Sequence, residues 1–389
     1  MSENIVIAGA ARTPHGSLQG QFKNLSATAL GSIAIKAAVE RAKIPVDVPE
    51  EVYMGCVLPA GLGQAPARQA ALGAGLPQRV GCTTVNKVCG SGMKAAMLAH
   101  DSILSGSARI VIAGGMESMS NAPYLLSKAR GGYRLGHGSV YDHMFLDGLE
   151  DAYERGSLMG KFAEDTAEKF QFTRQAQDSF AQESLTRAKT ATERGWFRKE
   201  IAPVQVDKSE ITIDEPAMRA DPAKIPTLKP AFRDGGTITA ANASGISDGA
   251  AALVIMSGSE AERRGVAPLA RILGHATHAQ APAWFTTAPV GAIHKLLDRV
   301  GWKTGEVELF EINEAFAVVA LAVMRELNLP HEKVNVHGGA CALGHPIGAS
   351  GARIVVTLLS ALQQRGLRRG VASLCIGGGE ATAVAIELI

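Results

Sequence analysis

Three side chains capable of attacking or deprotonating a carbonyl compound lie in glycine-rich segments that are far apart in the chain. They occur in Cys89-Gly90-Ser91-Gly92, Gly344-His345-Pro346-Ile347-Gly348 and Cys375-Ile376-Gly377-Gly378-Gly379. A thiolate is a strong nucleophile, an imidazole accepts a proton near neutral pH, and glycines let a substrate carbonyl approach backbone N–H donors closely. Together these residue types predict acyl transfer through a covalent cysteine intermediate.

Five segments resemble the thiolases, in the same order and with matching separations. They are 85–92 around Cys89, Asn242 to Gly249, Asn313-Glu314-Ala315-Phe316, 338–351 around His345, and 375–379. The resemblance covers essentially the whole chain and is greatest to the acetyl-CoA acetyltransferases. It implies reversible Claisen condensation of two acetyl-CoA to acetoacetyl-CoA and CoA. The implied α/β fold has two similar halves forming a layered α-β-α-β-α core, with an inserted loop domain.

The resemblance also assigns a role to each catalytic group. Cys89 would be the nucleophile, and Cys375 would act as acid and base on the substrate carbon. His345 would accept the Cys89 proton and then donate a hydrogen bond to the thioester oxygen, where Asn313 would fix a water. The N–H groups of Gly377 and Cys89 would form an oxyanion hole. From its local sequence, Cys89 precedes a helix whose N-terminus should stabilise an exposed, activated thiolate.

A CoA site cannot be inferred from a nucleotide motif, because the chain has no P-loop and no G-x-G-x-x-G fingerprint. The resemblance places Ser244 near the pantetheine and implies further residues that line the substrate tunnel: Leu149, Met159, Arg219, Phe232, Ala240, Ala315 and Phe316. Taken singly, such Met and Phe residues are more often core, and such an Arg is more often solvated. CoA and its thioesters are the expected substrates, and no metal or redox cofactor is expected.

Three positions depart from the pattern of short-chain thiolases. Leu158 stands where many of them have His, Phe285 where Met is frequent, and His337 where Asn is more usual. Leu158 cannot donate a hydrogen bond to a thioester or to water. The first alternative is therefore a degradative thiolase acting on longer or aromatic 3-ketoacyl-CoA. A non-enzymatic acyl-CoA-binding protein and a thioester hydrolase are further alternatives, although Cys375 argues against the hydrolase.

Composition limits the class of protein. The 389 residues are enough for two or three domains, and the net charge of +2 provides no global field for nucleic acid or a membrane. No apolar run reaches the roughly 20 residues that span a bilayer. Five cysteines without a C-x-x-C spacing favour a reducing compartment over disulfides or zinc. With no targeting signal recognised at either end, we expect a cytoplasmic protein.

The predicted elements alternate between apolar strands and helices rich in small residues, which is typical of α/β proteins. We expect strands near 5–9, 52–57, 83–88 and 109–113, helices over 26–42 and from Cys89 to about 104, and a turn at Gly114-Gly115-Met116-Glu117. A helix over 350–364 and a strand over 371–375 repeat this layout near the C-terminus. Two similar halves would bring Cys89 and Cys375 together.

The predicted domains are 1–117 with 242–268, an inserted loop domain over 118–241, and 269–389. The insertion is charged and rich in turns, and it contains a long helix from Thr173, its predicted N-cap, to Arg194. A loop over 131–137 carries aromatic and basic groups and could form a subunit contact or be a solvated turn. The resemblance implies a homodimer or homotetramer.

Overall fold

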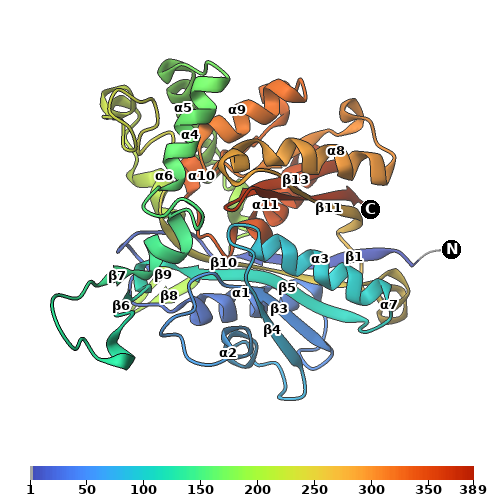
Figure 1. Ribbon diagram of the computed structural model, residues 1–389. Coiled ribbons are helices and arrows are strands. Elements are labelled where there is room, and N and C mark those ends of the chain that lie inside the picture. The colour runs from blue at the N-terminus through green and yellow to red at the C-terminus, as the bar shows by residue number, and fades with distance from the viewer. Residues whose placement is uncertain (1–2) are drawn as a thin grey trace.

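One ten-stranded sheet runs through the molecule in the computed structural model, which describes residues 3–389. Its strand order is β12-β13-β14-β11-β1-β10-β5-β3-β4, with β2 paired to β10. β1 (Ile5–Arg12) pairs along its length with β10 (Ser247–Ser257), but with β11 (Ala270–Ala279) only through residues 5–7. This short junction divides the sheet into two parts that lie one above the other (Figure 1).

The first part of the sheet is built mainly from the N-terminal third of the chain. Its other strands are β2 (Gly16–Ser17), β3 (Glu51–Gly55), β4 (Gly81–Val85) and β5 (Ile110–Ser118). The helices of this half are α1 (Ala27–Ala42), α2 (Pro66–Gly73) and α3 (Ser91–Leu104). The Ser26 hydroxyl caps α1 by accepting from the Ala29 N–H, which satisfies a donor that the first helical turn leaves free. The helix predicted over 26–42 is therefore present, and the structure identifies Ser26 as its N-cap.

The second part of the sheet is built from the C-terminal third. Its other strands are β12 (Leu309–Ile312), β13 (Arg369–Ile376) and β14 (Glu380–Leu388), and its helices are α8 (Ala288–Val300), α9 (Ala317–Glu326), α10 (Ala340–Leu343) and α11 (Ser350–Arg365). The helix α7 (Gly258–Arg264) packs instead on β1 and β10 of the first part. The predicted helix from Ser350 and the predicted strand ending in Cys375 are both present. Each of the two halves thus places one long helix beside one of the cysteines predicted to be catalytic.

Apolar side chains hold the layers together. α3 and α11 pack on each other between the two parts of the sheet, in one buried cluster with side chains from both parts. α1 and α2 cover the outer face of the first part, and α8 and α9 cover that of the second. Because each sheet face buries apolar surface against helices, the layers are α-β-α-β-α, as the resemblance implied (Figure 1).

The turn predicted at Gly114-Gly115-Met116-Glu117 is wrong, because β5 continues through it to Ser118. A Cβ on Gly114 would lie 2.1 Å from the Ala251 carbonyl oxygen, and one on Gly115 would lie 2.0 Å from that of Gly348. These glycines therefore permit close backbone approach inside the sheet. The strand predicted over 83–88 is also too long, since β4 ends at Val85.

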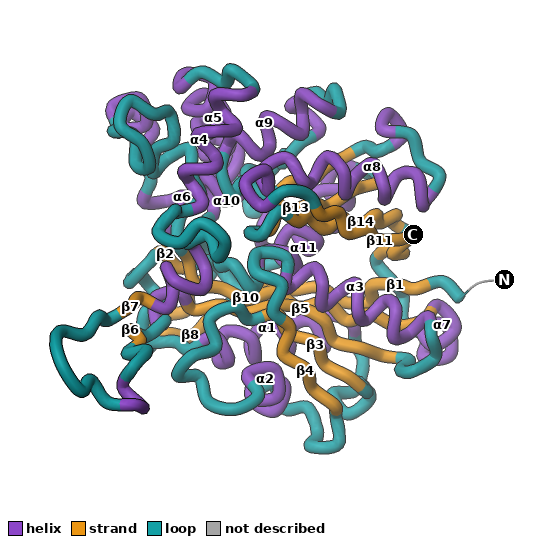
Figure 2. The backbone as a smooth tube through the Cα atoms, in the orientation of Figure 1, coloured by secondary structure: helices purple, strands orange, loops and turns teal. Residues whose placement is uncertain are grey.

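Residues 119–246 add no strand to the ten-stranded sheet. This segment forms β6 (Tyr124–Leu125), β7 (Tyr141–Asp142), the π-turn η3 (Phe145–Leu149), α4 (Met159–Lys169), α5 (Arg174–Glu193), β8 (Val204–Val206), β9 (Ser209–Ile211) and α6 (Glu215–Arg219). Thr173 caps α5 as predicted. Between β6 and β7, residues 126–140 form an arm that projects from the body and is mostly loop (Figure 2).

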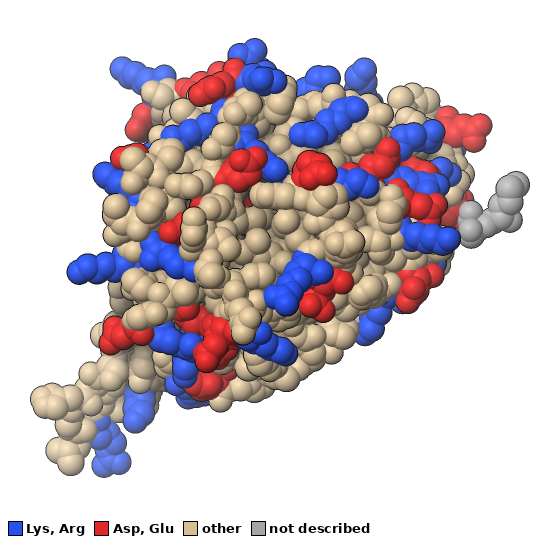
Figure 3. All heavy atoms as spheres, turned by 90° about the horizontal axis from the view of Figure 1, so that it is seen from above, with Lys and Arg blue, Asp and Glu red and all other residues tan. Residues whose placement is uncertain are grey.

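The net charge of the chain is small, at +2. On the face drawn in Figure 3, basic and acidic side chains are interspersed over the surface. Within residues 3–389, no helix is both long and apolar enough to cross a membrane.

A polar cluster outside the central cavity ties α3 to β11. An Asp101 carboxylate oxygen lies 3.1 Å from Nδ1 of His100 and 2.8 Å from Nε2 of His275. Because this carboxylate already pairs with both rings, the three groups satisfy one another as a hydrogen-bonded network. The network fixes the far end of the helix that follows Cys89.

Candidate active site

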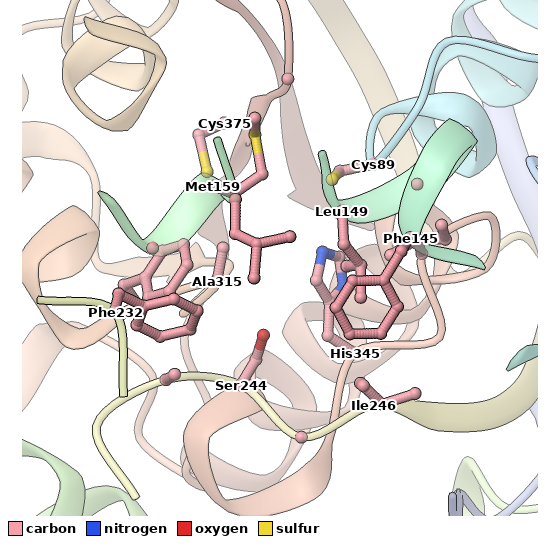
Figure 4. A pocket seen from close by; sticks show the side chains of 18 of the residues that line it. Cys89, Phe145, Leu149, Met159, Phe232, Ser244, Ile246, Ala315, His345 and Cys375 are labelled. Atoms are coloured by element: carbon pink, nitrogen blue, oxygen red, sulfur yellow. The ribbon is translucent and has the colours of Figure 1, made fainter. Parts of the chain in front are cut away.

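All the predicted catalytic residues except Asn313 line one cavity of about 430 Å³ between the two halves and the inserted segment. Figure 4 shows Cys89, His345 and Cys375 facing this space from different segments of the chain. The cavity is lined by most of the residues predicted for catalysis and CoA binding: Cys89, His345, Cys375, Gly377, Ser244, Leu149, Met159, Phe232, Ala240, Ala315 and Phe316. Tertiary structure thus joins residues that are up to 288 positions apart, the separation of Cys89 from Gly377.

A tight turn presents Cys89 immediately before α3. Val88 has a φ of 45°, a conformation that β-branched residues rarely adopt. The Ser91 hydroxyl stabilises this turn by donating to the Val88 carbonyl at 2.6 Å and accepting from the Lys87 N–H at 2.8 Å. Backbone strain of this kind costs about 1–3 kcal/mol and is frequent at active sites.

The prediction of an exposed, activated Cys89 thiolate is wrong for the free enzyme. The residue is half-buried, and burial raises the pKa of its thiol to about 11. The N–H groups of Gly377 and of Cys89 itself act in the opposite direction, because they stabilise the thiolate, but burial outweighs them. The resting nucleophile is therefore a thiol, and a base must remove its proton during attack.

His345 lies in the loop between α10 and α11. Its backbone N–H donates to the Gly245 carbonyl at 2.9 Å, next to Ser244, which links the two loops that line the cavity. Gly344 has a φ of +88°, and a Cβ there would lie 2.0 Å from the Ser247 hydroxyl. A glycine is needed at that position both for its left-handed conformation and for this close contact.

Buried Glu117 anchors the His345 loop to the first half of the molecule. Its carboxylate accepts the N–H groups of Val57 at 3.0 Å, Leu58 at 3.1 Å and Gly348 at 2.9 Å. Burial raises the pKa of Glu117 to about 7, and these three N–H groups act against the shift. One side chain therefore holds both β3 and the catalytic loop in place.

The imidazole of His345 is neutral in the free enzyme. Burial lowers its pKa to about 3, assisted by the positive charge of Arg353 and by His15. Its Nε2 lies 3.4 Å from Nδ2 of Asn313, which follows β12 and is itself fully buried. A neutral imidazole beside a protonated thiol can act as a general base when the thiol attacks a thioester.

Cys375, at the end of β13, supplies the second thiol. Burial and the nearby Cys89 sulfur raise its pKa well above the usual range. The N–H of Gly377 approaches the Cys89 sulfur closely enough to stabilise its thiolate, as does the N–H of Cys89. Two backbone donors therefore lie beside the Cys89 sulfur, while the predicted oxyanion hole, which needs donors aimed at the substrate oxygen, stays a prediction.

Two of the three departures from the short-chain pattern line the cavity. Leu158, the N-cap residue of α4, and Phe285, in η6 (Pro282–Thr287), both contribute apolar wall. His337 does not line it, because this ring is buried against Trp196 and Phe197. Leu158 and Phe285, but not His337, can therefore influence what the cavity accepts.

Arg219 also lies away from the cavity lining. Its side chain, 65% exposed on α6, pairs with Glu215 at 3.1 Å. The predicted tunnel contact is therefore absent from the described structure.

Several functional residues were missed from the sequence. The cavity is also lined by Leu18, Val88, Phe145, Gly148, Gly160, Ala231, Ala243, Gly245, Ile246 and Ile347. Ile246 and Ile347 could have been found, because each stands two residues after a predicted site residue. Phe145 carries no such signal, because the π-helix η3 that follows β7 brings it to the site.

The comparisons with known proteins agree with this geometry. The Thiolase, N-terminal domain family matches residues 5–259, and the Thiolase, C-terminal domain family matches residues 266–388. The chain belongs to the thiolase family.

Relatives and solved structures match over nearly the full length. Acetyl-CoA acetyltransferase 2 of Arabidopsis thaliana is 52% identical, covering 99% of this chain and 97% of the relative. The acetyl-CoA acetyltransferase of Escherichia coli is 51% identical over 99% of both chains. The Acat5 thiolase of Ascaris suum, solved in complex with coenzyme A, superposes with a TM-score of 0.95 at 44% identity, over 99% of this chain and 100% of that one.

Proposed function

We propose that this thiolase is an acetyl-CoA C-acetyltransferase, which makes acetoacetyl-CoA from two acetyl-CoA and cleaves it in reverse. The observation that carries the proposal is the convergence of two thiols, Cys89 and Cys375, and the His345 imidazole on one apolar cavity (Figure 4). A nucleophile with its base suffices for thioester hydrolysis, whereas carbon–carbon chemistry needs a second acid and base. Full-length relatives named acetyl-CoA acetyltransferase support the same reaction.

Cleavage proceeds in two balanced half-reactions. In the first, the Cys89 sulfur attacks the 3-keto carbon of acetoacetyl-CoA while His345 takes the thiol proton. The bond between C2 and C3 breaks, its electron pair goes to C2, and the Cys375 thiol protonates C2 to release acetyl-CoA. In the second, the Cys375 thiolate deprotonates CoA, whose sulfur attacks acetyl-Cys89. The departing Cys89 sulfur recovers its proton from His345.

The cycle uses the chain's own groups and CoA thioesters as substrates. Thiol, imidazole and backbone N–H donors account for every proton and electron pair, so we propose that no further cofactor takes part. Both cysteines must remain reduced for the cycle to turn over, and all five cysteines of the chain are free thiols. We therefore propose a reducing compartment, the cytoplasm, as its location.

The first test is consumption of acetoacetyl-CoA with and without free CoA. Cleavage that depends on CoA supports the proposal. Consumption without CoA would indicate a hydrolase, and binding without turnover would indicate an acyl-CoA-binding protein.

The same assay with 3-ketohexanoyl-CoA tests the alternative of a degradative thiolase. Leu158 and Phe285 favour this alternative because they make the cavity wall apolar. We expect acetoacetyl-CoA to have the higher kcat/KM.

Trimming the apolar wall at Leu158 enlarges the pocket and should change the enzyme's preference for acyl-chain length. We expect Leu158→Ala to raise kcat/KM for 3-ketohexanoyl-CoA relative to acetoacetyl-CoA by about tenfold, because a methylene in an apolar pocket changes discrimination by roughly 10- to 200-fold. Leu146→Ala is the control, since that side chain is 38% exposed and does not line the cavity. An unchanged substrate ratio in Leu158→Ala would place the acyl pocket elsewhere.

We also propose that the arm over residues 126–140 binds another copy of the chain in a homo-oligomer. The arm exposes large apolar side chains, with Leu135 at 97%, Val140 at 59% and Leu126 at 54%. Such a patch on a projecting segment favours association with a partner.

The oligomer proposal predicts a loss of mass on disrupting the arm. We expect Leu135→Asp to lower the mass measured by light scattering to that of a smaller assembly, because burying an unpaired carboxylate in an apolar contact is costly. Val46→Asp, on a surface side chain 42% exposed outside the arm, should leave the mass unchanged. An unchanged mass in Leu135→Asp would exclude the arm as the contact.

A further inference from the structure

The two ring nitrogens of His345 have different partners. Nδ1 lies 2.5 Å from the hydroxyl oxygen of Ser350, whereas Nε2 lies 3.4 Å from Nδ2 of Asn313. The imidazole borders the cavity, and Ser350, the first residue of α11, is completely buried behind it. The serine hydroxyl therefore acts on the side of the ring away from the substrate.

The hydroxyl of Ser350 also donates to the Pro346 carbonyl at 2.9 Å. A hydroxyl has one hydrogen, so Ser350 can only accept from the ring, and Nδ1 must carry the proton. The amide nitrogen of Asn313 is a donor, which requires a lone pair on Nε2. Both contacts therefore select the same neutral tautomer, with a proton on Nδ1 and a lone pair on Nε2.

We propose that Ser350 is a positioning residue that fixes the tautomer of His345, so that Nε2 is the atom that takes the Cys89 proton. This inference rests on the proposed thiolase reaction. Since Nδ1 stays protonated, the ring becomes an imidazolium whenever Nε2 gains a proton. The hydrogen bond from Nε2 to the substrate oxygen is then charge-assisted and strong.

The charges around the ring make this imidazolium transient. A carboxylate beside Nδ1 would stabilise the charged ring permanently, but the partner here is a neutral hydroxyl. Arg353, on the same helix one turn after Ser350, and His15 both oppose positive charge on the ring. The arrangement favours a ring that accepts the thiol proton during attack and returns it at the end of the cycle.

The local fold explains why a serine can serve this purpose. Its hydroxyl bonds to the carbonyl four residues earlier, Pro346, within the turn that leads into α11. The loop that carries the ring is held independently, by the bond from the Gly348 N–H to Glu117 and by the bond from the His345 N–H to the Gly245 carbonyl. Removing the hydroxyl should therefore change the tautomer balance more than the position of the loop.

The test compares Ser350→Ala and Ser350→Cys with the parent enzyme in CoA-dependent cleavage of acetoacetyl-CoA. We expect Ser350→Ala to lower kcat by about 100-fold with KM within about twofold, because a general base in the wrong tautomer loses function without losing substrate binding. Ser350→Cys preserves a side chain of similar shape with a weak acceptor, and should give an intermediate loss. Ser360→Ala is the matched control, since it removes another buried hydroxyl from α11.

A double-mutant cycle distinguishes positioning from a structural role. If Ser350 acts through His345, then Ser350→Ala with His345→Asn should have the kcat of His345→Asn alone, within about threefold. A purely structural contribution would multiply the two losses. That result, or a kcat for Ser350→Ala and Ser350→Cys within threefold of the parent, would overturn the proposal.

Alkylation of Cys89 by iodoacetamide, followed by mass spectrometry, separates this inference from the proposed function. The reaction needs no thioester substrate, and its rate depends on removal of the Cys89 proton. We expect Ser350→Ala and His345→Asn to slow it to the same extent, and the double variant to be no slower. If Ser350→Ala slows alkylation but the parent enzyme fails to cleave acetoacetyl-CoA, the proposed substrate is contradicted and the role of Ser350 is retained. If Ser350→Ala leaves the alkylation rate unchanged, the role of Ser350 is contradicted.

Discussion

Cys89→Ala should abolish CoA-dependent cleavage of acetoacetyl-CoA, with kcat falling by at least about 10⁴-fold, because the covalent acyl intermediate can no longer form. The same variant should lose exchange of labelled CoA into acetyl-CoA, since both half-reactions pass through acyl-Cys89. The tight turn before α3, with Val88 at a φ of 45°, places this sulfur at the cavity.

The control for Cys89→Ala is Cys82→Ala, which makes the same chemical change in β4, outside the cavity lining. We expect Cys82→Ala to retain parental kcat, and mass spectrometry after incubation with acetyl-CoA to find acetylation in Cys82→Ala but not in Cys89→Ala. Acetylation that persists in Cys89→Ala would identify a different nucleophile and would contradict the assignment.

Cys375→Ala should have the second largest effect, but with a different signature. We expect cleavage and condensation to fall by about 10³-fold or more, because no group remains to move the proton at C2 of acetyl-CoA. Exchange of labelled CoA into acetyl-CoA should fall by only about tenfold. An unperturbed thiol has a pKa of about 8.5. A fraction of CoA is therefore already a thiolate when it reaches acetyl-Cys89, and that fraction needs no base.

The ratio of exchange to condensation is therefore the informative measurement for Cys375. It should rise by about 100-fold in Cys375→Ala and stay at the parental value in Cys82→Ala. Equal losses of exchange and condensation would mean that Cys375 acts on Cys89 acylation itself, and the acid and base at the substrate carbon would have to be sought elsewhere. Burial of the Cys375 thiol, which raises its pKa, is consistent with a group that holds its proton until a carbanion forms.

The origin of the Cys89 reactivity illustrates where local sequence reasoning was insufficient. The helix that follows Cys89 led us to expect a stabilised thiolate, but the surrounding apolar wall raises the pKa of the thiol to about 11. Burial depends on residues such as Phe145 and Phe285, which are distant in sequence. The free enzyme therefore holds a neutral thiol and a neutral imidazole, and the proton moves during attack.

The family, the candidate catalytic groups and most of the helices and strands could be predicted from the sequence. Short glycine motifs marked Cys89, His345 and Cys375 as candidate catalytic residues, and Thr173 located the start of α5, because these features depend on neighbouring residues in the chain. The layered fold followed from the resemblance over the full length.

The contacts that hold the site residues in position depend on the tertiary structure and could not be predicted from the sequence. Gly115 was expected in a turn, yet it lies inside β5, where the absence of a Cβ leaves room for the Gly348 carbonyl. Glu117 anchors a loop 231 positions away, and Ser350 orients the His345 ring through a contact that helix patterning does not encode. Such long-range approaches leave no periodicity or spacing in the sequence, since each depends on how the two halves pack against each other.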